Sequence, residues 1–384
     1  MAFSSLSEEL HRLEADGLLR RRRVLDSPQG ARIVVDGEEY LSFCSNDYLG
    51  LASHPALIEA LQQGAARFGV GGGASHLVSG HFASHHDLET QLAAFVGLPR
   101  ALLFSTGYMA NLGIVTALMG RDDEVFADKL NHASLNDAAL LSRAKLTRFP
   151  HLDLVALERR LAASRARRKL VAVDAVFSMD GDIASVPELL ALCERYDSWL
   201  LLDDAHGFGV LGKDGRGVLE HFAVASPRIV YMATLGKAAG VAGAFAAGSE
   251  TLIEYLIQRA RTYIYTTAMP PPLAVATSAS LGLIAAEGWR RERLAELIGV
   301  LRRSLNVSRW QLLPSATAIQ PLVIGANRET LDVSEALRQR GLWVPAIRPP
   351  TVPKGQARLR ISLSAAHQVA DVERLAAALN EIHG

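Results

Sequence analysis

Residues 169–205, KLVAVDAVFSMDGDIASVPELLALCERYDSWLLLDDA, decide the fold. Two apolar runs, 169–178 and 199–205, flank a segment (186–197) whose apolar residues recur at helical spacing. Short apolar runs bounded by turn residues are typical of strands that are buried on both faces. The stretch therefore predicts a strand–helix–strand unit of a parallel sheet.

The same alternation extends in both directions from this unit. RALLFS (100–105) precedes a predicted helix over 108–120, EVFAD (124–128) precedes one over 132–144, and IVYMATLG (229–236) reads as a further buried strand. Nearer the N-terminus, ARIVVDGEEYLSF (31–43) predicts a hairpin that turns at Asp36-Gly37. Ser53 and Pro55 begin a predicted helix that Gly69 ends. We expect a doubly wound α/β sheet that is mostly parallel.

The pattern divides the chain into three predicted segments. Residues 1–45 form an N-terminal helix and hairpin segment, and 46–270 form a large domain that carries the sheet. After Met269–Pro272 the sequence changes to longer helices and a few amphipathic strands, such as ARLRISLS (357–364). Residues 271–384 are therefore expected to form a smaller α+β domain.

Composition excludes several classes of protein. Lys and Arg together number 40 and Asp and Glu also number 40, so no basic excess indicates binding to nucleic acid or to an anionic membrane. The arginine run 20–23 reads as a solvated helix end. Two cysteines, Cys44 and Cys193, cannot build a disulfide framework, which favours a reducing compartment. There is no signal-peptide pattern and no apolar run of membrane-spanning length, so we expect a soluble cytoplasmic protein.

Polar residues gather where the predicted strands end. Ligands of open α/β sheets bind at the carboxyl ends of the strands, so these residues are candidates for one site. They are Ser105–Tyr108 after the first strand, His132 at a helix start, Ser178 and Asp180, Asp203, Asp204 and His206, and Thr234 and Lys237. Asp204, beside Asp203, is expected to be structural.

Lys237 identifies the ligand. It is the single cation in ATLGKAAGVAGAF (233–245), and a lone buried ammonium costs several kcal/mol unless it has a partner or a covalent bond. A lysine amine can condense with an aldehyde, a carboxylate can hold a ring N–H, and helix-start amides bind phosphate. These three features together describe pyridoxal 5′-phosphate (PLP).

Other motif interpretations are weaker. LLLDDAH (200–206) resembles the acidic strand end of an ATPase, but the chain has no phosphate-binding G-x-x-x-x-G-K-[ST] loop. GVGGGAS (69–75) follows a helix rather than a strand, against a dinucleotide loop. His85-His86 lacks zinc-peptidase spacing and reads as solvated helix surface. We predict no metal site.

Long motifs in a fixed order give the chain its family resemblance. They are SFCSNDYLGL (42–51), GGGASHLVSGHFASHHDLE (71–89), LLFSTGYMANLG (102–113), NHASLNDA (131–138), VFSMDGD (176–182), LLDDAHGFGVLGKDGRG (201–217), TLGKAAG (234–240), YIYTTAMPP (263–271) and AIRPPTVPKGQARLRISLSAAH (346–367). The chain resembles the α-oxoamine synthases, PLP enzymes of the aspartate-aminotransferase fold (fold type I). The resemblance implies a seven-stranded, mostly parallel sheet. The chain departs from the family's F-G-K-x-x-G motif at Leu235.

The resemblance also implies residue roles. Lys237 would form the Schiff base and then act as the base at Cα, Asp203 would hold the ring N–H, and His132 would stack on the ring. The implied catalytic residues are Lys237, His132, Asp203 and His206; the implied cofactor contacts are Gly107, Tyr108, His132, Ser178, Asp203, His206, Thr234, Lys237 and Thr267. The implied substrate contacts are Arg20, Asn46, Arg348, Thr351 and Arg360. Thr267 would reach in from a second subunit, so a homodimer with shared sites is implied.

SHLVSGH (75–81) and AIRPPTVP (346–353) favour one branch of the family. That branch condenses L-alanine with a pimeloyl thioester, with loss of CO2, in biotin biosynthesis. Three alternatives stay open: a glycine acetyltransferase of the same family, an aminotransferase on the same fold, and a relative that has lost activity. The carrier of the acyl group, coenzyme A or a carrier protein, is also open.

Overall fold

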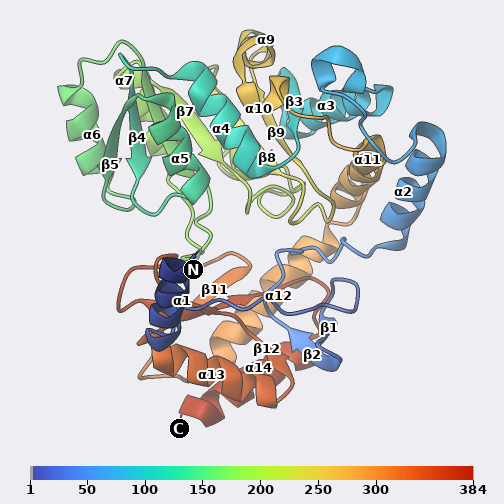
Figure 1. Cartoon of the computed structure of the whole chain (residues 1–384), viewed down its shortest axis with the longest axis vertical. Coiled ribbons are helices and arrows are strands. Elements are labelled where there is room, and N and C mark those ends of the chain that lie inside the picture. The colour runs from blue at the N-terminus through green and yellow to red at the C-terminus, as the bar shows by residue number, and fades with distance from the viewer. Residues whose placement is uncertain (1–2, 384) are drawn as a thin grey trace. The chain divides into compact units, whose positions relative to one another are not determined.

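The structure is a computed structural model that describes residues 3–383. The first two residues of the predicted N-terminal segment lie outside this range. The chain divides into two compact units: a larger one (51–178 and 183–291) and a smaller one (1–50, 179–182 and 292–384). Figure 1 shows the elements of both. Within the described range, no helix is both long and apolar enough to cross a membrane.

The larger unit is built on a seven-stranded sheet. Its strand order is β3-β9-β8-β7-β6-β4-β5, and only β9 runs antiparallel to its neighbours. The predicted fold type I sheet is thereby confirmed. The elements of this unit are α2 (Pro55–Phe68), η1 (His76–Gly80), α3 (Ala83–Val96), β3 (Arg100–Phe104), α4 (Gly107–Leu118), β4 (Glu124–Asp128), α5 (Ala133–Ser142), β5 (Lys145–Phe149), α6 (Leu154–Ala163), β6 (Lys169–Asp174), α7 (Val186–Arg195), β7 (Trp199–Asp203), α8 (Val218–His221), β8 (Ile229–Thr234), β9 (Ala244–Gly248), α9 (Glu250–Arg259), α10 (Arg261–Ile264) and α11 (Pro271–Ala286).

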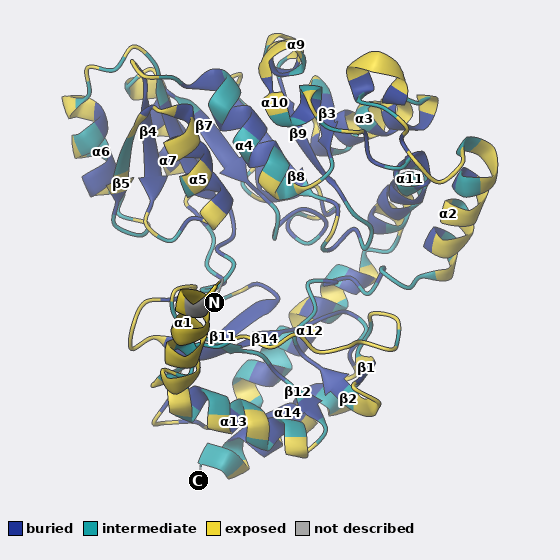
Figure 2. Cartoon of the chain, viewed as in Figure 1, coloured by how far each residue is buried: buried dark blue, intermediate teal, exposed yellow. Residues whose placement is uncertain are grey.

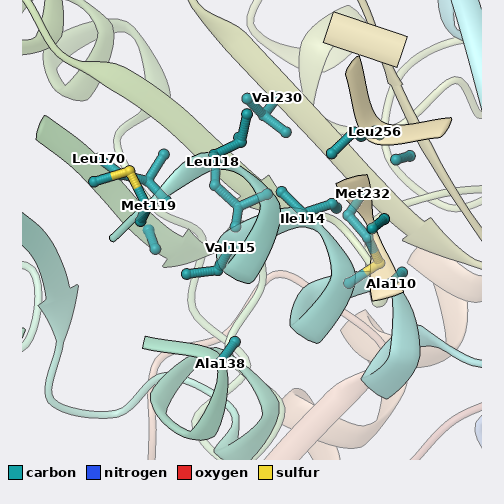
Figure 3. Packing of buried hydrophobic residues seen from close by; sticks show 14 of the residues in the cluster. Ala110, Ile114, Val115, Leu118, Met119, Ala138, Leu170, Val230, Met232 and Leu256 are labelled. Atoms are coloured by element: carbon teal, nitrogen blue, oxygen red, sulfur yellow. The ribbon is translucent and has the colours of Figure 1, made fainter. Parts of the chain in front are cut away.

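The sheet is buried on both faces. Strands β4, β7 and β9 contain hardly any exposed residue, as Figure 2 shows by their dark colour. On one face, Ile114 and Val115 of α4 pack against Met232 of β8 and Leu256 of α9 (Figure 3). On the other face, Phe245 contacts Phe208, which contacts Phe95 of α3. Side chains alternate along a strand, so β9 supplies both cores.

The smaller unit holds two sheets of its own. One is three-stranded (β1-β2-β12) and the other is four-stranded (β10-β11-β14-β13). Asp36 and Gly37 both have positive φ, 51° and 85°, which is the backbone that the predicted Asp-Gly hairpin requires. The elements are α1 (Ser4–Ala15), β1 (Arg32–Val35), β2 (Glu38–Ser42), α12 (Trp289–Ser304), β10 (Gln311–Leu312), β11 (Ile319–Gly325), α13 (Asn327–Gln339), β12 (Leu342–Trp343), β13 (Ala346–Ile347), β14 (Ala357–Ser362) and α14 (Val369–His383).

The observed units differ from the three predicted segments. The N-terminal hairpin belongs with the C-terminal residues because β2 pairs with β12 in a parallel ladder. Helix α11 belongs with the large sheet because it packs on α2 and α3. Neither pairing leaves a local signal in the sequence, since both join segments that are distant along the chain.

Two local predictions need correction. The N-cap of α2 is His54, whose Nδ1 accepts from the Ala56 N–H at 3.2 Å, and not Ser53. The strand predicted over 169–178 ends at Asp174, because β6 pairs with β7 only up to the Asp174–Asp203 register. Because β6 ends at Asp174, the carboxyl group of this residue lies at the end of the strand, beside Asp203.

Candidate active site

The parallel strands of the larger unit end around a cavity of about 200 Å³. Asp174, Asp203 and Thr234 end the adjacent strands β6, β7 and β8, and α4 begins after β3, which runs in the same direction. All of the sequence-predicted cofactor contacts except Thr267 line the cavity, so the structure brings eight of them together: Gly107, Tyr108, His132, Ser178, Asp203, His206, Thr234 and Lys237.

Lys237 lies in a tight loop between β8 and β9. The loop is closed by the Leu235 N–H, which donates to the Gly243 carbonyl at 2.8 Å, and Gly243 adopts φ 97° to enter β9. The Ser280 hydroxyl of α11 also donates to the Ala239 carbonyl at 2.7 Å. With the backbone fixed, the Lys237 Nζ lies 2.8 Å from Nε2 of His206.

The Asp203 carboxylate is held by two donors. The Ala205 N–H donates to Oδ1 at 3.1 Å, and the Asn111 Nδ2 donates to Oδ2 at 2.8 Å. Asn111 is completely buried and also donates to the Ser134 hydroxyl at 2.9 Å. Both oxygens therefore keep a lone pair for a further donor, in an orientation that the protein fixes.

His132 is the N-cap of α5 and is positioned by two neighbours. Its backbone N–H donates to Asp174 Oδ2 at 3.0 Å, and its Nδ1 lies 2.8 Å from the Ser134 hydroxyl. Burial, with the Lys237 charge as a further contribution, lowers the pKa of His132, although the Asp203 charge acts in the opposite direction. A neutral imidazole is a flat ring that can stack on a planar ligand.

Asp174 lies beside Asp203 at the ends of neighbouring strands. The two residues are register partners on parallel strands, and burial together with the Asp203 charge raises the pKa of Asp174 well above its usual range. Two carboxylates on neighbouring strand ends cannot both ionise without a large cost. Asp174 is therefore the neutral member of the pair.

The start of α4 forms the anionic-ligand end of the cavity. The Thr106 hydroxyl accepts from the Met109 N–H at 3.1 Å, and the first helical amides are those of Gly107 and Tyr108. Amides of the first helical turn have no partner within their helix and bind anions. The Tyr108 hydroxyl donates to Asp137, which fixes the tyrosine ring at the cavity rim.

Sequence reasoning missed Asn111, Ser134 and Asp174 as lining residues. Asn111 had a usable signal, since it lies one helical turn after Gly107 in an otherwise apolar helix. Asp174 was missed because the strand was predicted to continue to Ser178, which put Asp174 inside the strand instead of at its end. Asp180, which the sequence placed with the site, instead forms a 2.7 Å ion pair with Arg358 in the smaller unit.

Asp204 is structural, as predicted. It is fully buried, and its Oδ2 accepts from the Val218 N–H and the Tyr231 hydroxyl, each at 2.7 Å. Burial raises its pKa from 3.8 to about 7. The group therefore contributes stability below its unfolded-state pKa and loses it as pH rises to about 7.

We expect Asp204→Asn to change the pH dependence of stability. The asparagine variant should gain stability relative to the parent chain between pH 5 and pH 8, because only the parent must ionise a buried acid. The gain should be a few kcal/mol, at about 1.4 kcal/mol per unit of pKa shift. Urea unfolding of the cofactor-free protein at pH 5 and pH 8 measures this gain. The same difference in free energy of unfolding between variant and parent at both pH values would contradict the pKa assignment.

The remaining predicted residues lie elsewhere in the chain. Thr267 is exposed and does not line the cavity. The predicted substrate contacts are all in the smaller unit, where they form two groups.

The first group surrounds Arg360 on β14. This guanidinium is 5 % exposed and donates to the Asn46 side chain at 3.2 Å, the Ser362 hydroxyl at 2.8 Å and the Tyr48 hydroxyl at 3.3 Å. These three hydrogen bonds fix the orientation of the guanidinium on β14.

The second group joins the N-terminal segment to the loop after β13. The Arg20 guanidinium donates to the Thr351 hydroxyl at 3.4 Å, and Arg348 donates to the Gly17 carbonyl. Burial and the nearby Arg20 charge lower the pKa of Arg348. Two neighbouring cations favour a ligand that carries negative charge.

Comparison with known proteins agrees with this geometry. The family model "Aminotransferase class I and II" matches residues 38–379. The 8-amino-7-oxononanoate synthase of Nitrosospira multiformis is 69% identical over 365 residues, which cover 95% of this chain and 92% of the relative. The chain belongs to the 8-amino-7-oxononanoate synthases, within the aminotransferase class I and II family.

Solved structures of the wider family share the fold over almost the whole chain. A serine palmitoyltransferase with PLP superposes with a TM-score of 0.92 at 29% identity, covering 99% of this chain and 96% of that one. The 8-amino-7-oxononanoate synthase of Francisella tularensis superposes with a TM-score of 0.78 at 30% identity, covering 89% and 97%. As a member of this family, the chain is a PLP-dependent acyltransferase.

The cavity residues of this 8-amino-7-oxononanoate synthase family member fit PLP. The cavity lining includes an amine, a carboxylate, an imidazole ring and the start of a helix. In this order, these groups match the aldehyde, the ring nitrogen, the ring face and the phosphate of the cofactor. Asp174 Oδ1 and Asn111 Oδ1 are buried at this cavity and have no hydrogen-bond partner among the described residues. Buried polar atoms of this kind are expected at a site that is completed by a ligand or water.

Proposed function

We propose that this enzyme condenses L-alanine with a pimeloyl thioester, with loss of CO2, to give 8-amino-7-oxononanoate and the free thiol. Atoms balance because the new C–C bond replaces the thioester C–S bond and the alanine carboxylate leaves as CO2. One observation carries the proposal: a single cavity is lined by Lys237, His206, Asp203 and His132, in a chain that is 69% identical to an 8-amino-7-oxononanoate synthase.

PLP, when bound, supplies an aldehyde and a ring that withdraws electrons from the amino-acid Cα. Lys237 provides the amine for the aldehyde and, when released, the base that takes the Cα proton of alanine. His206, whose Nε2 lies 2.8 Å from Nζ, would act as a second proton carrier. A positioned base of this kind typically contributes about 10²–10⁴-fold to the rate.

Asp203 would hold the ring N–H, because a carboxylate fixed by two donors is a strong acceptor for a protonated nitrogen. Asn111 acts as its positioning residue and ties it, through Ser134, to His132. Gly107, Tyr108 and Thr234 would hold the phosphate, while Ser178 and His206 would bond the phenolic oxygen of the ring.

The smaller unit would supply the substrate contacts. Arg360 is the residue suited to the alanine carboxylate, since a guanidinium can donate two parallel N–H groups to one carboxylate. Asn46 would orient Arg360. Arg348, Arg20 and Thr351 would contact the acyl donor, which carries negative charge on either coenzyme A or a carrier protein.

The enzyme would work as a homodimer in which Thr267 of one subunit completes the phosphate contacts of the other, and it would be cytoplasmic. The support for sharing is that Thr267 is exposed and does not line the cavity of its own chain. Contact between Thr267 and the phosphate would therefore have to cross the boundary between the two subunits.

Subunit mixing tests this sharing. Thr267→Glu should repel the phosphate and Lys237→Ala removes the base, so each variant alone should be inactive. After mixing and reassembly, half of the dimers are hybrids and one of their two sites carries neither change. Activity should therefore return to about a quarter of the wild-type value. No recovery from mixtures that contain hybrids, verified by differently tagged chains, would contradict shared sites.

Thiol release by purified protein with PLP tests the reaction itself. We expect release with L-alanine plus pimeloyl-CoA and none with glycine plus acetyl-CoA. Release only with the glycine pair would make the enzyme a glycine acetyltransferase and overturn the substrate proposal. Release with neither pair, together with amino transfer from an amino acid alone, would favour an aminotransferase. A pimeloyl carrier protein is the second donor to be supplied.

A further inference from the structure

A group of histidines lies outside the cofactor cavity, around the start of α3. We call His76, His81, His85, His86 and Glu89 the histidine cluster. They come from η1, the turn after it and the first two turns of α3. Within the cluster, His81, His86 and Glu89 have ligand atoms that all lie within 4.8 Å of one another. None of these residues lines the cofactor cavity.

His85 cannot serve as a ligand. Its Nδ1 accepts from the Phe82 N–H at 3.2 Å, so its proton is on Nε2, which donates to the Met269 carbonyl at 3.0 Å. Both ring nitrogens are thus engaged with the backbone. Its full burial also shows that the solvated-surface prediction for His85 was wrong, although His86 is exposed as predicted.

His76 orients His81 toward Glu89. The two Nδ1 atoms are 3.0 Å apart, so exactly one of them carries the shared proton. The His76 ring stacks on the Tyr263 ring, with the ring centroids 4.9 Å apart. When His81 donates from Nδ1, its Nε2 presents a lone pair toward Glu89 Oε2, 4.0 Å away. A metal-bound histidine usually donates a hydrogen bond from its other ring nitrogen, which fixes the orientation of the ring.

Among the described residues, no lysine or arginine forms an ion pair with Glu89. The Glu89 Oε1 accepts from the Leu103 N–H at 2.9 Å, and Arg100 is paired with Glu254 at 3.0 Å. The 4.0 Å between His81 Nε2 and Glu89 Oε2 is too long for a hydrogen bond.

The spacing suits an ion between the ligand atoms. Zinc binds nitrogen and carboxylate oxygen at about 2.0–2.2 Å, so one ion spans atoms that lie about 3 to 4 Å apart. The His81 Nε2 and Glu89 Oε2 atoms are 4.0 Å apart, and all three ligand atoms lie within 4.8 Å of one another. His86 and Glu89 are three residues apart on α3 and share a helix face. A cavity of about 500 Å³, lined by His76, His81, His86, Glu89 and Thr90, gives the ion access from solvent.

We propose that His81, His86 and Glu89 bind a divalent transition-metal ion of the zinc type, with the fourth coordination position open to this cavity. Two imidazoles and one carboxylate are a ligand set that zinc uses in sites with an open position. The proposal is independent of the proposed function, because no residue of the cofactor cavity takes part.

Metal binding to the holoenzyme tests the proposal. Chelator-treated holoenzyme is dialysed against buffered Zn²⁺ and its metal content is measured, with the visible spectrum of Co²⁺ as a second probe. We expect one ion per chain and the intense absorption of a four-coordinate Co²⁺ site.

Three variants decide where the ion binds. His86→Gln changes an exposed residue and should keep the fold, and His11→Gln, exposed on α1, is the matched control. His86→Gln and Glu89→Gln should each weaken metal binding at least about tenfold. His76→Phe keeps the stacking on Tyr263 but removes the hydrogen bond to His81, and it should weaken metal binding about 10–100-fold. The His11 variant should bind like the parent. No stoichiometric binding by the parent chain, or equal binding by the His86 and His11 variants, would overturn the site.

Discussion

Lys237→Ala is expected to abolish thiol release while leaving the protein folded. The variant loses the amine that bonds the cofactor aldehyde and the base at Cα, and the base alone is worth about 10²–10⁴-fold. The fold should survive because the loop around Lys237 is held by backbone contacts, among them Leu235 to Gly243 and Gly240 to the Lys237 carbonyl. Thiol release and circular dichroism, recorded on the same preparation, measure the two expectations.

The matched control is Lys213→Ala, which removes an exposed lysine of the same unit and should retain full activity. The Lys237 variant should also lose the visible absorption band that PLP gives when it is bonded to a protein amine. Near-normal turnover in the Lys237 variant would refute the proposed role. A variant that is inactive only because it fails to fold would be recognised by its spectrum.

Asp203→Asn is expected to bind PLP yet lose at least about 10²-fold in turnover. An amide is close in shape to the carboxylate but cannot stabilise a positively charged ring nitrogen as strongly. Without that charge, removal of the alanine Cα proton should become slow. Exchange of the Cα proton with D2O, in the absence of thioester, measures this step directly.

Asp197→Asn, at an exposed ion pair with Arg228, is the control and should exchange like the parent chain. Asn111→Leu adds a graded test, because it removes the side-chain donor from Asp203 Oδ2 and keeps the volume similar. Its exchange rate should fall between those of the parent and the Asp203 variant. Normal exchange in Asp203→Asn would show that the ring nitrogen is held by another group.

Much of the fold could be predicted because the central strands are short apolar runs between turn residues. EVFAD and the Asp36-Gly37 hairpin were placed as the structure has them. Two strands of the seven-stranded sheet were missed, for different reasons. β5 (Lys145–Phe149) has an exposed, polar pattern that is typical of a sheet edge, and β9 (Ala244–Gly248) consists, apart from Phe245, of small residues that read as a loop.

The candidate site was predictable where a polar residue interrupts an apolar run, as at Asp203. It was not predictable where the residue works through a neighbour, as Asn111 does through Asp203 and Ser134. Tyr48 is a further example, since it reads as a core aromatic and yet its hydroxyl accepts from Arg360. Such roles depend on contacts between elements that lie far apart in the sequence.

The closed loop between β8 and β9 also sets how easily Lys237 could be replaced from outside. A well-oriented group within one molecule behaves as if it were present at about 10⁵–10⁸ M. A small amine added at about 1 M to the Lys237→Ala enzyme would therefore restore only a minute part of the rate. The anchoring of Gly243 and Ala239 thus gives one primary amine an effective concentration that no solution can reach.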